Sequence, residues 1–596
     1  MKAIMLMFDS LSRRMLPPYT DMDMITPNFQ RLSEKAVTFD NFFVGSLPCM
    51  PVRRELHTGR YNFLHRTWGP IEPFDVSMPE LLKKSGVYTH LVSDHIHYWD
   101  DGGSTYHKRY NTWECCRGQA ADSWVGKVAA PEIPEHVPTM REYTHPIWWK
   151  DYWNNHNKIE KEGCYPQIAT FNGGMEFLEN NADQDNWFLQ IETFDPHEPF
   201  DMPDEFRHLY EKDGDYTGDF FNSPSYGVVM EDQAVVDHGQ ALYKSLITMC
   251  DRSLGRVLDF MDAHNMWDDT MLILNADHGL MVGEKDWWAK SVMPCYNEIS
   301  NLPFYIWDPR NKATGRRQSL AQTIDIPPTL LDFFGLPIPT EMQGKPLTPV
   351  VENDTPIRDV GLFGYHGSFI NMVDNDGHVY MRASQTIENK PSFEYTLMPT
   401  TRSGLMGAKR LAQAELVEPF GFTKGLKTLK IPAETKMGAP IFCNSFQYGH
   451  LLWDLNTDSD QLYPVDDPTK EADMMNKLLQ AMEDSDAPAE QYVRVGLERG
   501  KTYTAQDVQE MRTAQNTVEK GLLSGAIWEQ EAITLFIALA GMMSDDQIQS
   551  GKQFLKTQSK DTGVITCPMV EALIHQKYVA NPQQARYFIT KLKRTL

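Results

Sequence analysis

One short stretch of the chain combines residue types that could carry out chemistry on an anion. Residues 46–60 read SLPCMPVRRELHTGR, and they place Cys49 one helical turn before Arg53 in a chain with only 8 cysteines. Pro51 suits the first turn of a helix and Gly59 suits a helix end. We therefore expect Cys49 at or just before a helix N-terminus, where free N–H groups and the helix dipole favour an anion. A buried structural cysteine beside a surface arginine is the alternative.

Carboxylates and imidazoles follow four apolar runs. The runs are KAIMLMFDS (2–10), VYTHLVSDHIHYW (87–99), WFLQIETFDPHEPF (187–200) and TMLILNADHG (270–279). Short, continuously apolar runs are typical of strands buried on both faces of a parallel sheet, and such sheets bind ligands at the carboxyl ends of their strands. The sequence thus predicts that six side chains gather at one sheet edge: Asp9, His95, His97, His197, Asp277 and His278.

Helix-like segments at 27–37, 78–86 and 242–264 separate these runs. Strands alternating with helices predict an α/β fold, a large, mostly parallel sheet flanked by helices. This catalytic domain is expected to span 1–353. A hairpin with a turn at DNDG indicates a smaller α+β domain at 354–467.

Residues 468–596 are predicted to form a mainly helical C-terminal extension. The extension carries no recognisable chemistry. Plain packing is the first expectation for it, and a lid or homo-oligomerisation is the alternative.

The composition limits the classes of function. The chain has 596 residues and a net charge of -25, with 41% hydrophobic and 23% charged residues, so it is expected to be globular and to bind neither nucleic acid nor membrane. Residues 1–14 lack the long apolar region of a signal peptide, and the apolar run 532–543 is too short to cross a bilayer. We therefore expect a cytoplasmic location, where Cys115 and Cys116 would be free thiols.

Several segments resemble one family. CMPVR, followed by TGR, resembles the C-x-P-x-R signature of the type I sulfatases, members of the alkaline phosphatase-like superfamily in which this cysteine is oxidised to formylglycine. Phosphonate monoester hydrolases of the same superfamily share the motif. The resemblance covers roughly residues 1 to 480 and continues, in the family's order, through FDSL, VYTHLVSDHIHYW, FDPHEPF, ADHGLMVGEKDWWAKS, QTIDIPPTLLDFFGLPIP and HLLWDLNTDSDQLYPV.

The resemblance implies hydrolysis of a sulfate monoester by a formylglycine at position 49. One hydroxyl of the hydrated aldehyde attacks sulfur, and the second then expels sulfate. The resemblance implies that Arg53 orients this diol and that Lys290 holds a sulfuryl oxygen. It implies that His197 protonates the leaving oxygen and that His97 assists the second hydroxyl. His95 stands where the family has a lysine, and a protonated imidazole would supply the same charge.

The resemblance also implies a divalent metal site. The implied ligands are Asp9, Ser10, residue 49, Asp277 and His278. Ser10 replaces a second aspartate of the family, and His278 replaces the usual asparagine, although histidine occurs in the phosphonate hydrolase branch. Ca²⁺ is the first expectation for an oxygen-rich site. The imidazole and the missing carboxylate favour Mn²⁺ or another transition metal as the alternative, and Mg²⁺ is a further one.

The substrate is expected to be a small sulfate ester of a sugar or an aryl alcohol. Tryptophan and tyrosine rings in 61–75, 97–107 and 147–153 could stack on either one, and core packing is the alternative. Four polar residues could bond hydroxyl groups: Asn62, His65, Asp100 and Asp101. A formylglycine-generating enzyme or an anaerobic sulfatase-maturating enzyme is the implied partner.

Two other functions compete with a sulfatase. A phosphonate monoester or phosphodiester hydrolase would use the same site, but the histidines at 95 and 97 favour sulfate. A non-catalytic, metal-stabilised binding protein would be expected to lack Cys49, Lys290 or a site histidine, and all are present.

Overall fold

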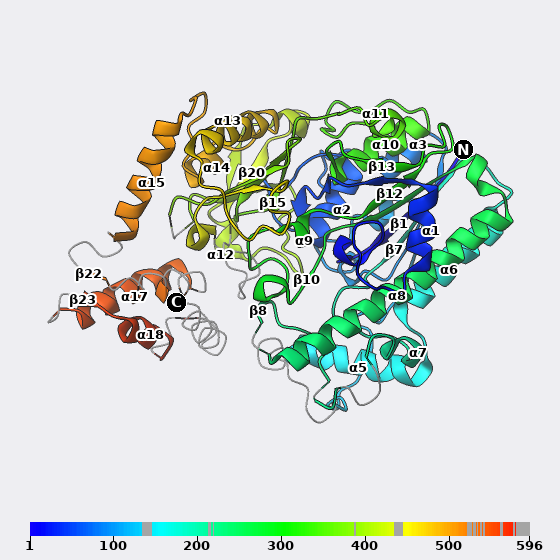
Figure 1. Cartoon of the computed structure of the whole chain (residues 1–596), viewed down its shortest axis with the longest axis horizontal. Helices are drawn as coiled ribbons and strands as arrows, with labels where there is room; N and C mark the ends of the chain where they lie inside the picture. Colours follow the sequence, from blue (N-terminus) through cyan, green and yellow to red (C-terminus); the bar gives the residue numbers. More distant parts are fainter. Residues whose placement is uncertain are drawn as a thin grey trace. The chain divides into compact units, whose positions relative to one another are not determined.

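The computed structural model describes most of the chain in two compact units (Figure 1). The described residues are 1–133, 146–211, 216–218, 220–229, 231–386, 389–433, 445–520, 527–528, 532, 535–536, 539, 543–560, 564–575 and 579. The first unit comprises 1–290, 295–363 and 395–430, and the second comprises 291–294, 364–394 and 431–596. Residues 395–430 thus belong to the first unit, although they follow the expected boundary at 353. The division into three domains stays a prediction.

An eight-stranded sheet forms the centre of the first unit. Its strand order is β13-β2-β12-β9-β1-β7-β5-β6. Strand β12 runs antiparallel to β2 and β9, and the other neighbours are parallel. The strands are β1 (Lys2–Phe8), β2 (Val37–Phe39), β5 (Tyr88–Ser93), β6 (Thr112–Cys115), β7 (Trp187–Thr193), β9 (Thr270–Ala276), β12 (Phe304–Trp307) and β13 (Gly315–Arg317).

Helices pack against both faces of this sheet (Figure 1). One layer comprises α1 (Pro27–Lys35), α6 (Pro166–Asn181) and α8 (Gln233–Ala263), which contact one another or the sheet. The layer on the other face comprises α2 (Cys49–Thr58), α3 (Met78–Lys84) and α10 (Ile326–Phe333). Further helices of this unit are α5 (Pro146–Glu162), α7 (Asp204–Arg207), α9 (Asn297–Ser300), α11 (Thr348–Asn353) and α12 (Ala408–Leu411).

Ten further strands of the described chain pair in smaller sheets. They are β3 (Phe42–Phe43), β4 (Ser46–Leu47), β8 (Gly227–Val228), β10 (Met281–Val282), β11 (Trp287–Ala289), β14 (Ala321–Gln322), β15 (Val360–Tyr365), β18 (Phe393–Thr396), β19 (Glu415–Val417) and β20 (Thr428–Pro432).

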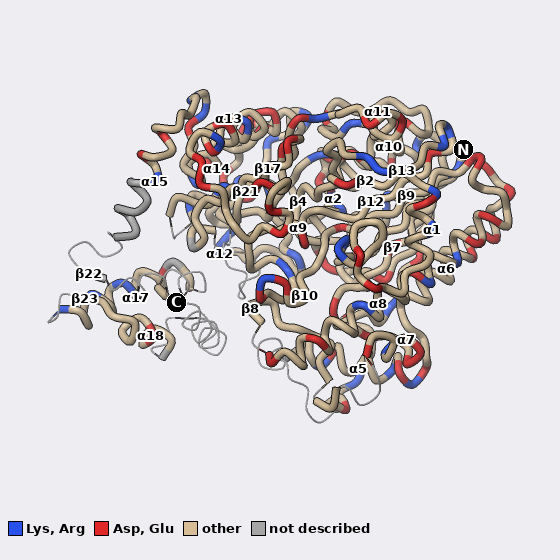
Figure 2. The backbone as a smooth tube through the Cα atoms, in the orientation of Figure 1, with Lys and Arg blue, Asp and Glu red and all other residues tan. Residues whose placement is uncertain are grey.

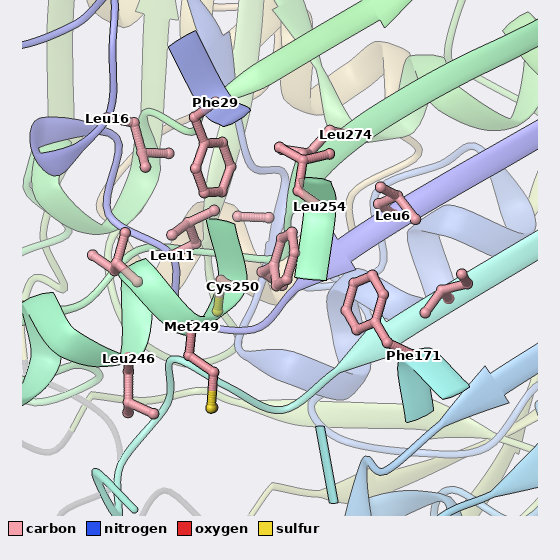
Figure 3. Packing of buried hydrophobic residues seen from close by; sticks show 14 of the residues in the cluster. Leu6, Leu11, Leu16, Phe29, Phe171, Leu246, Met249, Cys250, Leu254 and Leu274 are labelled. Carbon is pink, nitrogen blue, oxygen red and sulfur yellow. The ribbon is translucent and has the colours of Figure 1, made fainter. Parts of the chain in front are cut away.

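The core lies between the central strands and the α1, α6 and α8 layer. Alternate residues of a strand face the same side, and the register places Leu6 of β1 opposite Ile191 of β7 and Leu274 of β9. Figure 3 shows Leu6 and Leu274 among the buried side chains of this cluster, together with Phe171 of α6 and Leu254 of α8. This register and packing align the carboxyl ends of β1, β7 and β9, and the candidate site residues lie in the loops that follow these ends.

The four apolar runs form neighbouring parallel strands, which confirms the predicted α/β fold. Their strands end earlier than the runs, so the acidic and histidine residues lie in the loops after β1, β5, β7 and β9. Helix α8 begins at Gln233, nine positions before the expected start at 242, and its first residues are half-buried or exposed, so the apolar periodicity is weak there. The expected helix 27–37 is too long, because Val37 already lies in β2.

The second unit contains the predicted hairpin and a set of helices. Strands β16 (Ile370–Asp374), β17 (His378–Arg382) and β21 (Leu451–Asp454) are antiparallel neighbours. The other elements are β22 (Ile527–Trp528), β23 (Val564–Ile565), α13 (Pro468–Asp484), α14 (Ala489–Arg494), α15 (Ala505–Lys520), α17 (Asp545–Gln558) and α18 (Cys567–His575). The described residues of the apolar run 532–543 are buried in one cluster with α17 and α18.

Acidic and basic residues are interspersed along the described chain (Figure 2). In the described part of the chain, no helix combines the length and apolar composition that a bilayer crossing requires.

Candidate active site

The nucleophile candidate lies at the first residue of α2. The helix starts at Cys49, ends at Thr58 and is followed by Gly59, whose φ of 60° lies in the left-handed region that favours glycine. The Cys49 side chain is 3% exposed, and its Sγ lies 3.3 Å from Nε2 of His278 and 3.5 Å from Nζ of Lys290. Burial, and then the charge of Asp9, raise the pKa of the Cys49 thiol, so an unmodified cysteine here stays protonated at neutral pH.

Two buried carboxylates face this cysteine from the ends of neighbouring strands. Asp9 follows β1 and Asp277 follows β9, and both are fully buried. Burial, and then the charge of Asp9, raise the pKa of Asp277 to about 8. Burial would also raise the pKa of Asp9, but Lys290, His95 and Arg53 outweigh it and hold that pKa well below its usual range. Without a cation Asp277 is therefore mostly protonated at neutral pH, and a cation bound between the two carboxyl groups would favour the ionised form of both.

Ser10 links the two carboxylates. Its backbone N–H donates to Oδ1 of Asp277 over 3.0 Å, and its hydroxyl donates to Oδ1 of Asp9 over 2.8 Å. The chain reaches this position through a φ of 63°, a left-handed conformation that costs a non-glycine residue about 1 kcal/mol. Ser10 therefore fixes the spacing of the carboxylates, and its predicted role as a metal ligand stays a prediction.

The donor set fits a divalent metal. One ligand atom from each of Asp9, Cys49, Asp277 and His278 lies within 4.8 Å of all the others. Burial, and then Lys290, lower the pKa of His278, so its imidazole is neutral and able to coordinate. An all-oxygen site would favour Ca²⁺. Two carboxylates with an imidazole can bind either Ca²⁺ or Mn²⁺.

Arg53 is held by three carboxylates beneath Cys49. Its Nε donates to Oε1 of Glu192 over 2.7 Å, and its two Nη atoms donate to Asp277 over 2.8 Å and to Asp9 over 3.1 Å. Nη1 also donates to the carbonyl oxygen of Cys49 over 2.9 Å. Burial opposes the charge, but these carboxylates raise the pKa of Arg53 well above its usual value, so Arg53 is a fixed cation.

Lys290 supplies a second fixed cation. It follows β11, and its Nζ lies 3.0 Å from Nε2 of His278 and 3.1 Å from the hydroxyl of Ser10. Burial would lower its pKa, but the Cys49 sulfur and the Asp9 carboxylate raise it. A buried ammonium beside Cys49 can hold an oxyanion of a bound ester.

Three histidines surround the same centre. His95 Nε2 lies 3.2 Å from Oδ2 of Asp9, and His97 Nδ1 lies 2.6 Å from Oδ2 of Asp100. Burial lowers the pKa of all three histidines, that of His197 to about 4. His95 is thus a neutral imidazole in this structure. It does not carry the positive charge that the family's lysine would supply at this position.

His197 lies in the loop after β7. Its Nδ1 lies 2.5 Å from the carbonyl oxygen of Glu198 and 3.1 Å from the Glu198 carboxylate, and its ring packs 4.2 Å from that of Phe194. With Nδ1 directed at these oxygens, Nε2 is the ring nitrogen left for a substrate. The structure therefore brings the predicted catalytic and metal-binding residues together at the carboxyl ends of the central strands, and their catalytic roles stay predictions.

The sequence reasoning missed Glu192 and Tyr98. Oε2 of Glu192 accepts hydrogen bonds from the hydroxyl of Tyr98 over 2.9 Å and from Nε2 of Gln190 over 3.0 Å, while Oε1 binds Arg53. Glu192 is the only acidic residue within the buried strand WFLQIET, and a fully buried carboxylate requires a partner. That feature of the sequence could have indicated a buried ion pair, and only the structure identifies Arg53 as the partner.

The polar residues expected at the substrate lie in different places. Asp100 pairs with His97, and Asp101 is exposed. Asn62 donates to the carbonyl of Pro51, and His65 packs edge-on against the rings of Phe420 and Phe422. Both Asn62 and His65 line one small pocket with these two phenylalanines.

The aromatic segment 147–153 belongs to the core. Trp149, Tyr152 and Trp153 are at most 4% exposed and form one cluster. Core packing, the alternative interpretation, is thus what the structure shows for these three rings.

A model of the sulfatase family matches residues 2–336 of the chain. The chain belongs to the sulfatase family. It is 27% identical over 211 residues to an arylsulfatase of Clostridium perfringens, a match that covers 32% of this chain and 43% of the relative. It is 22% identical over 407 residues to an N-acetylglucosamine-6-O-sulfatase of Bacteroides thetaiotaomicron, covering 59% of this chain and 71% of the relative. For the first of these relatives the chain thus spans less than half of the length.

Two solved structures with the same fold illustrate the range of similar proteins. One is a protein in complex with its substrate D-glucosamine-2-N,6-O-disulfate, with a TM-score of 0.52 and 14% identity over 81% of this chain and 96% of that one. Another is a phosphonate monoester hydrolase of Agrobacterium radiobacter, with a TM-score of 0.50 and 16% identity over 81% of this chain and 94% of that one. At these identities the likeness shows the alkaline phosphatase-like fold and leaves the substrate open.

Proposed function

We propose that this sulfatase-family hydrolase cleaves a sulfate monoester of a sugar or an aryl alcohol, using a formylglycine formed from Cys49. The observation that carries the proposal is the position of Cys49 Sγ, 3.5 Å from the Lys290 ammonium and 3.3 Å from His278, at the start of a buried helix. An anionic group that docks at residue 49 meets the helix N-terminus and a fixed cation together.

The chain's own residues divide the work around that position. Lys290 binds an oxygen of the sulfuryl group, and Arg53 orients residue 49 through its carbonyl contact. His197, with Nδ1 held by Glu198, presents Nε2 to the leaving oxygen. Because the neutral ring carries its proton on Nδ1, Nε2 first takes up a proton from water and then donates it to that oxygen. His97, oriented by Asp100, accepts a proton from the second hydroxyl of residue 49.

Asp9, Asp277 and His278 would hold the divalent metal, together with residue 49. When bound, the metal supplies positive charge that polarises the sulfuryl oxygens and favours the ionised form of the nucleophile. These donors fit both Ca²⁺ and Mn²⁺, and elemental analysis of the purified protein identifies the bound ion.

A phosphonate monoester or phosphodiester hydrolase is the second candidate. The imidazole of His278 next to Asp277 supports it, because the family resemblance of the sequence implies that histidine occurs at this position in the phosphonate hydrolase branch. The test is a parallel assay on 4-nitrophenyl sulfate, a phosphodiester and a phosphonate monoester, with protein produced beside a formylglycine-generating enzyme. Higher kcat/KM for the sulfate supports the sulfatase, and higher kcat/KM for either phosphorus ester would replace it by the second candidate.

A further inference from the structure

Arg402 is a cation at the edge of the candidate active site with no carboxylate partner among the described residues. It lies in segment 395–430, which belongs to the same compact unit as Cys49. Its guanidinium carbon lies 5.8 Å from the centroid of the Trp68 ring, and this ring lies edge-on to His97 at 4.8 Å between centroids. One tryptophan ring thus separates Arg402 from a candidate catalytic histidine.

The backbone holds Arg402 at this place. The buried guanidinium of Arg66 donates to the carbonyl oxygens of Met398 and Thr400, each over 3.0 Å. The N–H of Gly102, in the loop after His97, donates to the carbonyl oxygen of Arg402 over 3.2 Å. A Cβ at Gly102 would lie 2.5 Å from the carbonyl oxygen of Thr401, so glycine is what allows the two segments to approach.

Two N–H donors at this place lack an acceptor. Nε of the half-buried Arg402 and Nε1 of Trp68, which is 4% exposed, are both buried atoms without a hydrogen-bond partner in the described structure. Leaving a buried donor unpaired is destabilising, and more so for a charged group. Both donors therefore favour an acceptor, and a negatively charged oxygen satisfies the arginine best.

The positive charge of Arg402 acts on His97 of the candidate active site. Burial is the main cause of the lowered pKa of His97, and Arg402 adds to it. The protein as a whole carries a net charge of -25, which opposes the approach of an anion except where a local cation compensates. Charges further away than about 8 Å are largely screened at physiological salt, so a fixed arginine near the site outweighs the distant surface.

We propose that Arg402 selects sulfate esters that carry a second anionic group, a sulfate or a carboxylate, on the same small molecule. This inference rests on the proposed sulfatase function. With the reacting sulfate at residue 49, the rest of the ester extends past His97 and along Trp68, whose ring is comparable in size to a sugar ring. The second anion then meets the guanidinium and the indole N–H.

The experiment compares Arg402→Met with the wild type on three kinds of ester. These are 4-nitrophenyl sulfate, N-acetylglucosamine 6-sulfate and two esters with a second anion, glucosamine 2-N,6-O-disulfate and a sulfated glucuronic acid. Methionine keeps the apolar contact with Trp68 and removes the charge. Lys409→Met, which removes an exposed charge from the same segment, is the matched control.

We expect the wild type to favour at least one ester with a second anion over the singly charged sugar ester. Arg402→Met should lower kcat/KM for that ester about 10- to 100-fold more than for 4-nitrophenyl sulfate, mainly through KM. Arg402→Lys should keep part of the preference, and Lys409→Met should keep all of it. The two doubly charged esters show whether the second group is a sulfate or a carboxylate.

Other outcomes overturn the inference. No preference in the wild type, an equal loss on all esters, or equal losses in Arg402→Met and Arg402→Lys would mean that Arg402 only supports Trp68 and His97 or contacts water. These results leave the sulfatase function intact as long as 4-nitrophenyl sulfate is hydrolysed. If only phosphorus esters are hydrolysed, it is the proposed function that fails, and the same variants measured on those esters then show whether Arg402 acts on charge.

Discussion

Glu192→Gln tests whether a buried carboxylate positions the arginine beneath the nucleophile. Glu192 lies on β7 and binds Nε of Arg53 at 2.7 Å, and its other oxygen accepts from Tyr98 and Gln190. After the opposing effect of burial, Glu192 is the first influence on the raised pKa of Arg53. Glutamine keeps the shape and one acceptor oxygen but removes the charge.

The structure bounds the loss of stability. Removing one partner of a buried ion pair costs about 3–5 kcal/mol when the remaining charge is left alone. Arg53 keeps Asp9 and Asp277 as partners, so the expected cost is nearer to that of one charge-assisted hydrogen bond, about 1.5–3 kcal/mol. The variant should therefore fold and melt at a lower temperature.

The loss of activity should exceed what the loss of stability explains. Without its Nε anchor, Arg53 can rotate away from the carbonyl oxygen of Cys49, and a displacement of about 1 Å costs up to about 100-fold in rate. We expect kcat on 4-nitrophenyl sulfate to fall by this order while KM changes little, because Lys290 still binds the sulfuryl oxygens. The conversion of residue 49 is checked by peptide mass spectrometry in every variant.

Two control variants separate positioning from packing. Tyr98→Phe removes one hydrogen bond to Glu192 and leaves the contact with Arg53, so kcat should fall only a few-fold. Glu192→Asp keeps the charge and should recover part of the rate lost in Glu192→Gln. A folded Glu192→Gln protein with unchanged kcat would refute the reasoning, and so would a Tyr98→Phe protein that loses as much activity.

Four further perturbations test the remaining groups. Active protein should contain a residue 49 lighter than cysteine by the difference between a thiol and an aldehyde; Cys49→Ala should fold without activity, and activity of wholly unmodified protein would contradict the mechanism. Asp277→Ala should lose both bound metal, measured by elemental analysis, and turnover; full metal content would show that the ligand assignment is wrong. His197→Ala should slow esters with poor leaving groups far more than aryl sulfates, and equal losses along the series would argue against a proton donor. Burial lowers the pKa of His57 to about 3, so between about pH 6.5 and pH 3 the unfolded chain binds a proton that the folded chain does not. The free energy of unfolding, measured with urea, should therefore fall by up to about 1.4 kcal/mol per pH unit as the pH drops below about 6.5. His57→Gln should reduce this slope by the equivalent of one proton, and an unchanged slope would show that His57 is not its cause.

The strands and the site edge could be predicted because both depend on local patterns. Apolar runs that end in acidic or imidazole residues correspond to parallel strands β1, β5, β7 and β9, whose carboxyl ends share one edge. The helix start at Cys49 was equally visible, since Pro51 and Gly59 mark its ends. These features need no knowledge of contacts between distant segments.

The residues that the sequence did not indicate depend on such distant contacts. Glu192 was overlooked because nothing local shows that it meets Arg53, 139 positions away. Arg402 lies after the predicted catalytic domain in the sequence, and it comes close to the candidate active site because segment 395–430 packs in the first unit. The aromatic run 147–153 had the composition of a stacking surface, and its burial in a cluster depends on the helix that it forms.

The charges around Cys49 narrow the class of ester that the site can hold. The directly bonded groups comprise the carboxyl groups of Asp9, Asp277 and Glu192 and the cations of Arg53 and Lys290. Once a bound cation ionises Asp277, the negative charges of these side chains exceed the positive ones by one. With a divalent cation bound, the centre has one positive charge, which a monoanionic ester neutralises and a doubly charged phosphate monoester would exceed. Sulfate monoesters, phosphonate monoesters and phosphodiesters are all monoanions at their reacting group. The centre therefore accepts each of them equally well on charge, and the choice among substrates must come from groups further out, as we infer for Arg402.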